Sequence, residues 1–171
     1  WYLAETFDAS IGQGFTLATP LQMALVMSEA ANGGKKYRPY LVKDIIALDG
    51  TVIKHFDPVV ERDLNIDPSV ISLVQEGLHE VSTVGTAAAM FKDFPVPIAG
   101  KTGTAENSHG RDHGWFVAYG PFDNPNIAVA VIVENAGYGA TSAVPIGYKI
   151  LSAAFGLDKP KTPENQPAPA Q

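Results

Sequence analysis

The residues best suited to chemistry in this chain are Lys101, Thr102, Gly103 and Thr104, which follow one another directly. They combine one ammonium group, two hydroxyls and one position without a side chain. Four residues match a short motif by chance often, so a plain strand with a surface lysine is the alternative interpretation. What surrounds the motif must therefore decide its role.

A phosphate-binding loop is a sharper alternative, because Gly100, Lys101 and Thr102 match the last three positions of that motif. Such a loop needs a glycine five residues before Gly100, and Pro95 occupies that position. Pro97 removes a further backbone amide that could bind an anion. A polar turn and a strand follow the motif, where the loop would require a helix. A nucleotide site is therefore not expected.

Three β-rich runs around the motif predict neighbouring strands. They span residues 98–105, 114–119 and 127–134, and an Asn-Pro-Asn turn separates the last two. Upstream, residues 40–48 and 51–56 flank Asp49 and Gly50. An Asp-Gly pair between two such runs predicts a hairpin with a two-residue turn, in which both residues have positive φ. We expect this hairpin to be structural.

Helix signals lie on both sides of these strands. Residues 19–22, Thr-Pro-Leu-Gln, form a capping box with proline at the first helical position, and residues 32–34 end the helix. Asp67 before a proline predicts a second helix, and Thr141 or Ser142 a third. Apolar residues at helical spacing should face the core: Met23, Val26, Met27 and Ala30 in the first helix, and Val70, Ile71, Val74, Leu78 and Val81 in the second. A ligand groove is the alternative use of the methionines.

Composition narrows the possible functions. The chain of 171 residues is 46% hydrophobic, which fits a globular domain. It has 12 Lys and Arg against 18 Asp and Glu, a net charge of −6, so a nucleic-acid partner is not expected. It has no cysteine, which excludes disulfides and thiolate metal sites. The longest membrane-like run, residues 127–133, is far shorter than the roughly 20 residues that span a bilayer.

Other candidate sites are weaker. His109 and His113 are four residues apart, but glycines nearby disfavour a helix and no third ligand is evident, so no metal is expected. Ser108, His109 and Asp112 include the residue types of a hydrolytic triad, yet they crowd into one polar turn. We interpret that turn as a solvated loop. Trp115 is expected to lie in the core, and His79 to be an ordinary surface or partly buried histidine.

Four further segments accompany the lysine motif in a fixed order. They are residues 10–14 (Ser-Ile-Gly-Gln-Gly), 18–24 (Ala-Thr-Pro-Leu-Gln-Met-Ala), 113–116 (His-Gly-Trp-Phe) and 133–135 (Val-Glu-Asn). Together they resemble the C-terminal part of the transpeptidase domain of class B penicillin-binding proteins, most closely the elongation-type peptidoglycan D,D-transpeptidase. The resemblance covers residues 1–157, and the pairing of Gly-Gln-Gly with Thr-Pro-Leu-Gln makes it specific. The four prolines in residues 158–171 predict a disordered tail.

The resemblance implies a fold and a site. The fold is the C-terminal portion of the serine penicillin-recognising α+β fold, an antiparallel sheet covered by helices. Lys101 and Thr104 would be catalytic: the ammonium would assist proton transfer beside a serine of the second family motif, and the Thr104 amide would form half of an oxyanion hole. Thr102 and Thr104 would bind the substrate carboxylate through their hydroxyls, and Gly103 would let substrate pair along the strand.

The resemblance also implies partners and a location. The parent protein would cross-link peptidoglycan by acyl transfer from a D-alanyl-D-alanine stem peptide, without a cofactor, and β-lactam antibiotics would inhibit it. It would lie on the outer face of the bacterial cytoplasmic membrane, held by an N-terminal anchor outside these residues. A non-catalytic β-lactam sensor on the same fold is the alternative.

Two departures from the family pattern matter. No serine stands three residues before a lysine anywhere in the 171 residues. The resemblance places the nucleophile, its lysine base and the second-motif serine before Trp1. The chain alone is therefore expected to be inactive, with the N-terminal part of the same protein as its partner. Residues 4–6, Ala-Glu-Thr, stand where the family more often has Gly-Asp-Thr.

Overall fold

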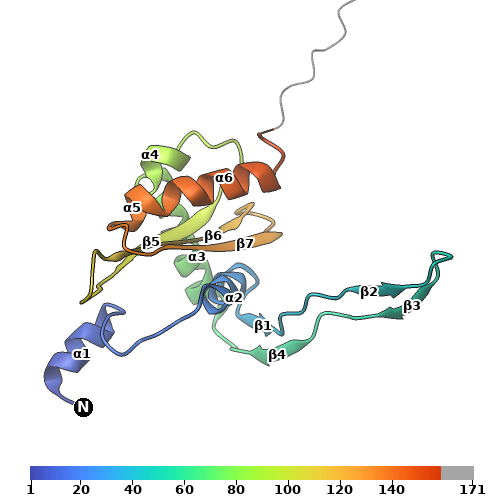
Figure 1. The fold of residues 1–171 in the computed structure, drawn as a ribbon, viewed down its shortest axis with the longest axis horizontal. Helices are drawn as coiled ribbons and strands as arrows, with labels where there is room; N and C mark the ends of the chain where they lie inside the picture. The colour runs from blue at the N-terminus through green and yellow to red at the C-terminus, as the bar shows by residue number, and fades with distance from the viewer. Residues whose placement is uncertain (159–171) are drawn as a thin grey trace, which may run out of the picture.

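A three-stranded antiparallel sheet forms the centre of the molecule in the computed structural model, which describes residues 1–158 (Figure 1). Its order is β5 (Ala99–Ala105), β6 (His113–Gly120) and β7 (Ile127–Val133), so β5 is an edge strand. The three predicted strands are confirmed. The predicted tail lies outside the described residues, apart from Asp158.

Helices cover both faces of this sheet. The helices α2 (Pro20–Ala31) and α3 (Pro68–Thr83) pack on one face, and α4 (Ala88–Phe91), α5 (Gly139–Ser142) and α6 (Val144–Ala154) lie on the other (Figure 1). Because β6 is covered twice, its alternate residues enter two separate cores. Phe116 is fully buried beneath α6, and Val117 packs with Met27 of α2.

The two upstream helices begin where the sequence predicts. Thr19 Oγ1 accepts a hydrogen bond from the Gln22 amide at 3.2 Å, and Gln22 Oε1 accepts one from the Thr19 amide at 2.8 Å, which completes the capping box. Asp67 caps α3 by accepting from the Ser69 amide at 2.8 Å. Hydrogen bonds from the Ser69 hydroxyl and amide hold the pKa of Asp67 below its ordinary value.

The predicted core faces of these helices are partly wrong. Val26, Val70 and Val74 are about half exposed, whereas Met27 and Ile71 are buried. In α3 the buried residues are Ile71 and Ser82, so the covered face includes a polar residue. Hydropathy favours the valines, but the position of the sheet decides which side of the helix is covered.

The upstream hairpin differs from the prediction in its turn. The strands β2 (Asp44–Ile46) and β3 (Val52–His55) pair, but only Gly50 of the turn has a positive φ, at +88°. The Gly50 amide donates to the Ala47 carbonyl, and the Ala47 amide donates to the Thr51 carbonyl. Three residues therefore form the loop, which is a turn followed by a left-handed glycine.

This hairpin extends a second ribbon away from the sheet. The strands β1 (Lys35–Tyr37) and β4 (Val60–Asp63), which the sequence does not predict, pair with each other and lead into it (Figure 1). The last helix also differs from its prediction. Thr141 and Ser142 do not cap α6; their hydroxyls donate to the Tyr138 carbonyl, and the separate turn α5 precedes α6.

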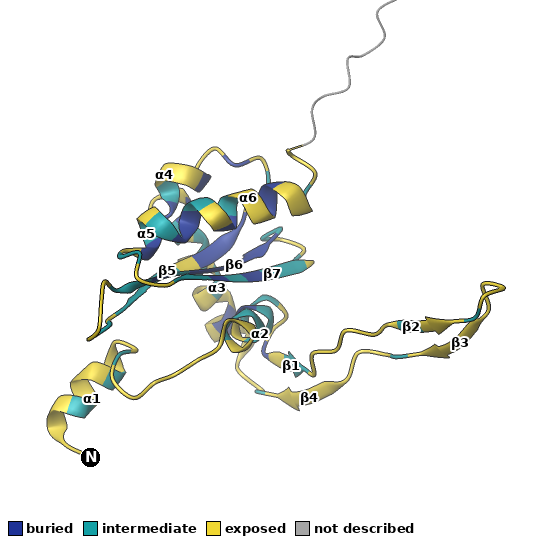
Figure 2. Cartoon of the chain, in the orientation of Figure 1, coloured by how far each residue is buried: buried dark blue, intermediate teal, exposed yellow. Residues whose placement is uncertain are grey.

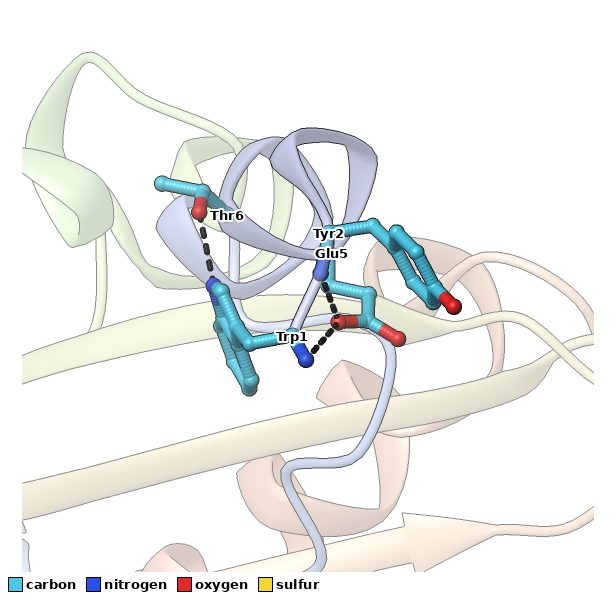
Figure 3. Close-up of polar contacts among 4 residues, drawn as sticks. All are labelled: Trp1, Tyr2, Glu5 and Thr6. Atoms are coloured by element: carbon cyan, nitrogen blue, oxygen red, sulfur yellow. Dashed lines mark hydrogen bonds and ion pairs between the residues drawn. The ribbon is translucent and has the colours of Figure 1, made fainter.

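The first helix, α1 (Leu3–Ser10), is held by its own side chains at its start. Figure 3 shows Glu5 reaching back to accept a hydrogen bond from the Tyr2 amide, and Trp1 Nε1 donating to Thr6 Oγ1 at 2.8 Å. Glu5, which departs from the usual family pattern, and Thr6, which matches it, therefore both stabilise the N-terminus of α1. No residue of α1 is buried.

Candidate active site

The four motif residues all lie on the edge strand β5. Side chains alternate along a strand, so Lys101 and Gly103 lie on one face and Thr102 and Thr104 on the other. Lys101 pairs with Val117 of β6, which belongs to the core beneath α2 and α3. The lysine thus lies on the α2 side of the sheet, and both hydroxyls lie on the α5 side.

Two of the motif side chains, Lys101 and Thr102, have hydrogen-bond partners. Lys101 is exposed, and its Nζ donates to the Thr102 carbonyl at 2.8 Å. The Thr102 hydroxyl lies 2.7 Å from the Thr86 hydroxyl, in the segment before α4. The cation and the hydroxyls therefore flank the same stretch of strand from opposite faces.

Gly103 serves packing as well as access. A Cβ at this position would lie 3.2 Å from the Cβ of Trp115, its cross-strand partner on β6. That approach is tighter than ordinary van der Waals contact, so a side chain at Gly103 would displace the tryptophan or the strand. Trp115 itself is half-buried rather than a core residue.

The backbone edge of β5 that faces away from β6 is the central feature of the site. The amide and carbonyl of one strand residue point to the same edge, and this direction alternates from residue to residue. The carbonyls of Ile98 and Thr104 both bond to side chains from outside the sheet, so they mark this edge. The Thr102 and Thr104 amides point the same way, which places the candidate oxyanion donor on the free edge.

Helix α3 fixes the beginning of that edge. The Ile98 carbonyl accepts hydrogen bonds from Ser82 Oγ at 2.8 Å and from His79 Nδ1 at 2.6 Å. Because a carbonyl only accepts, Nδ1 of His79 carries the proton. The imidazole also stacks on Phe122, with ring centroids 4.4 Å apart. No local pattern in the sequence indicates this role, since His79 and Ile98 are 19 positions apart along the chain.

Gln13 fixes the other end. Its Nε2 donates to the Thr104 carbonyl at 2.9 Å, and its Oε1 accepts from the Glu106 amide at 3.2 Å. The flanking Gly12 and Gly14 have φ of +78° and +72°, a conformation that glycine adopts without strain. The Gly-Gln-Gly segment thus folds a loop that aims Gln13 at β5.

A groove of about 350 Å³ runs beside the motif. It lies between the loop after α1 and the α2 side of β5, and Met23 and Trp115 help to line it together with all four motif residues. The two methionines of α2 therefore have different environments: Met27 is buried in the core, and Met23 lines the groove. A larger hollow of about 770 Å³ adjoins it beyond Ala105.

The weaker candidates form no second site. Ser108 and His109 are exposed, with Ser108 Oγ 2.9 Å from His109 Nδ1, as expected for a solvated turn. His113 Nδ1 accepts a hydrogen bond from the Asn135 amide at 3.0 Å, so the Val-Glu-Asn segment holds the first residue of β6 in place. Among residues 1–158, no three metal-ligating side chains gather in one place.

An antiparallel sheet with helices on both faces and a Lys-Thr-Gly-Thr edge strand defines a penicillin-recognising α+β fold. The chain belongs to the family described as the penicillin binding protein transpeptidase domain, whose model matches residues 1–152. Within this family, the chain is of the class B elongation type, as the sequence predicts.

Individual relatives support this assignment. The chain is 36% identical to the peptidoglycan D,D-transpeptidase MrdA of Haemophilus influenzae, over 88% of this chain and 26% of the relative. It superposes on penicillin-binding protein A from M. tuberculosis, a ceftriaxone acyl-enzyme complex, with a TM-score of 0.78 and 34% identity over 86% of this chain and 35% of that one. For Pseudomonas aeruginosa PBP2 in complex with WCK 5153 the TM-score is 0.73 and the identity 38%, over 90% and 34%.

The chain thus spans about a quarter to a third of the length of these relatives. Within residues 1–158, no helix is both long enough and apolar enough to cross a bilayer.

Proposed function

We propose that this chain forms the substrate-binding wall of the active site in an elongation-type, penicillin-binding peptidoglycan D,D-transpeptidase. One observation supports this most directly. The edge strand β5 presents the Lys101 ammonium, two threonine hydroxyls and the Thr104 amide along a single backbone edge, and both ends of that edge are held by side chains.

The chemistry follows from these groups together with a serine that this chain does not contain. That serine would attack the carbonyl of the penultimate D-alanine of a stem peptide. The Thr104 amide would donate to the oxyanion that forms, a contribution of roughly 3 kcal/mol per donor in acyl-transfer enzymes. The terminal D-alanine would leave as its amine takes a proton, and the amine of a second stem peptide would then accept the acyl group. Lys101 would assist the proton transfers.

The hydroxyls of Thr102 and Thr104 would hold the terminal carboxylate. They lie on the face of β5 opposite Lys101, so a ligand along the edge meets the hydroxyls and the ammonium from two sides. A β-lactam carries the matching carboxylate and would be attacked in the same way. The active protein would need the nucleophile from its other residues, and it would act on the outer face of the cytoplasmic membrane, held there by an anchor outside this chain.

The test compares two proteins labelled with fluorescent penicillin. A protein that carries the complete transpeptidase domain should form a covalent adduct on its Ser-x-x-Lys serine, and the 171-residue chain alone should form none. A stable acyl adduct on any serine of this chain, located by mass spectrometry, would contradict the proposal. Release of D-alanine from a stem-peptide substrate separates a transpeptidase from a β-lactam sensor, which would be acylated without turnover.

Valine substitutions test the carboxylate contacts in the complete protein. Thr102→Val or Thr104→Val removes a hydroxyl but keeps the backbone amide, so substrate binding should weaken by about 1.5–3 kcal/mol, the usual scale for a charge-assisted hydrogen bond. Titration with substrates that carry or lack the terminal carboxylate checks this. Equal losses for the two kinds of substrate would exclude the proposed contact.

A further inference from the structure

The Gln13 side chain makes an unusual pair of contacts with β5. Its two hydrogen bonds, to the Thr104 carbonyl and from the Glu106 amide, flank Ala105 on one side of the strand. In a parallel sheet, the amide and carbonyl of one residue in the neighbouring strand bond in this same way to the two residues that flank its partner. We call these two hydrogen bonds the Gln13 bridge.

The Gln13 bridge and helix α3 together set how much of the β5 edge is open. At one end the Ile98 carbonyl is occupied by Ser82 and His79. At the other end the Thr104 carbonyl and the Glu106 amide are occupied by Gln13. Between these ends lie the edge-facing groups of Gly100, the amide of Thr102, the Thr102 carbonyl, which accepts from Lys101 Nζ, and the amide of Thr104.

The bridge also holds the backbone at the point where the chemistry would need it most. Gln13 is half-buried and fixes the peptide group that directly follows Thr104. The strand beyond Ala105 leaves the sheet in an exposed turn, so no β-ladder continues on that side to hold it. A displacement of about 1 Å in such a group can lower a rate by roughly 100-fold.

We propose that Gln13 is a positioning residue for acylation, and that its carboxamide takes the place of a neighbouring strand. It orients the Thr104 amide toward the oxyanion and ends the stretch of edge on which a substrate backbone can pair. This inference rests on the proposed function. Gln13 itself touches no reacting atom, so its removal should slow the acylation step more than it weakens initial binding.

The experiment uses the protein with its complete transpeptidase domain and a chromogenic β-lactam. The dissociation constant of the initial complex and the first-order acylation rate constant are measured separately. Gln13→Leu removes both hydrogen bonds and should lower the acylation rate constant by about tenfold or more, while initial binding changes far less. Gln13→Glu keeps the acceptor for the Glu106 amide but turns a carboxylate toward the Thr104 carbonyl, and it should be at least as slow.

Gln75→Leu is the matched control. Gln75 is also half-buried, and its Nε2 donates to the Ala30 carbonyl at 2.7 Å, between α3 and α2 and away from the β5 edge. It should lower the melting temperature without changing the acylation rate constant of the folded protein. Acylation at the parent rate in both Gln13 variants would overturn the inference, as would an equal loss in Gln75→Leu.

Amide exchange gives a readout that does not depend on acylation. In the parent protein the Glu106 amide should exchange slowly, and in both Gln13→Leu and Gln13→Glu the segment that follows β5 should exchange faster. Unprotected exchange of Glu106 in the parent would overturn the bridge itself, whether or not the variants fold. If the parent is not acylated at all, the proposed function fails, and the exchange result still decides the bridge.

Discussion

The sheet β5–β6–β7 and the ribbon that contains β2 and β3 are both antiparallel and rich in β-branched residues, yet their environments are opposite. In β6, Phe116 and Ala118 have no exposed surface, because helices cover both faces. In the ribbon, Leu41 and Leu48 are fully exposed, and every residue of β3 is exposed (Figure 2). Both regions thus consist of paired strands, but only the sheet β5–β6–β7 is buried in a hydrophobic core.

The candidate site lies at the border between these two kinds of environment. β5 is buried at Ala99 and Gly100 and becomes exposed or half-buried from Lys101 onward. One edge of the strand is held by the full ladder to β6, and the other has no ladder but accepts hydrogen bonds from side chains, at its two ends and at the Thr102 carbonyl. Pairing with β6 therefore stabilises one edge of the strand, and we expect the chemistry at the other edge.

The largest expected effect concerns Lys101, an exposed residue whose loss should affect acylation but not folding. In the complete protein, Lys101→Ala should lower acylation by several orders of magnitude, because a positioned acid or base and its charge are lost. Folding should remain normal, since Lys101 is exposed. Penicillin-labelling kinetics and thermal melting measure the two effects.

The ribbon offers the control. Lys54 is also exposed, and its Nζ lies 4.6 Å from the centre of the Phe56 ring. Lys54→Ala should leave acylation unchanged. Near-normal acylation in Lys101→Ala would remove this lysine from the mechanism.

A second pair of variants tests the contrast in burial directly. Phe116 is fully buried between β6 and α6, and Phe7 of α1 is 64% exposed. Phe116→Ala should lower the free energy of unfolding by about 3–5 kcal/mol, the usual cost of removing a core phenylalanine. Phe7→Ala should change it by less than about 0.5 kcal/mol. Similar costs in urea unfolding would show that α1 is packed as firmly as the sheet.

Two helical glycines, Gly139 and Gly77, extend the contrast in burial to the helices around the sheet. A Cβ on Gly139 of α5 would lie 2.3 Å from the carbonyl oxygens of Gly103 and Trp115, so Gly139→Ala must push α5 away from β5 and β6. We expect a loss of about 1–3 kcal/mol in unfolding free energy. Gly77 in the middle of α3 has open space around it, and Gly77→Ala should instead add roughly 0.5–1 kcal/mol. Differential scanning calorimetry measures the shift in melting temperature of each variant. Shifts of the same sign would contradict this prediction.

The smallest effect at neutral pH concerns Tyr119, which is buried with α2 and has a hydroxyl without a hydrogen-bond partner within the described residues. Burial raises the pKa of Tyr119 to about 12, from an ordinary value of 10.0. The folded state therefore keeps the proton more tightly than the unfolded state. The stability that this difference in pKa contributes is fully present below pH 10 and is lost as the pH rises from 10 to about 12.

Tyr119→Phe removes this titration. At pH 7 its unfolding free energy should lie within about 1 kcal/mol of the parent, since an unpaired hydroxyl and some packing are lost together. Between pH 10 and 12 it should lose less stability than the parent. Tyr40→Phe, in the exposed ribbon, should keep the parent's pH dependence. An unchanged slope in Tyr119→Phe would mean that the hydroxyl is not buried in solution.

Features that depend on neighbours within a few residues could be predicted from the amino-acid sequence alone. The capping box at Thr19 and the cap at Asp67 form as predicted, because each joins groups two or three residues apart. The strands 114–119 and 127–134 were also predictable, since continuous apolar runs between turn residues favour buried strands. The same local patterns carried the resemblance to the family that the comparisons confirm.

The buried faces of the helices and the contacts between distant groups depend instead on the packing of the whole fold. Val70 and Val74 carry the right hydropathy for a core but remain about half exposed on α3. Gln13 and Thr104 are 91 positions apart and meet through a side-chain hydrogen bond that leaves no periodic pattern in the sequence. Burial and long-range hydrogen bonds depend on how whole elements pack, so local sequence preferences cannot specify them.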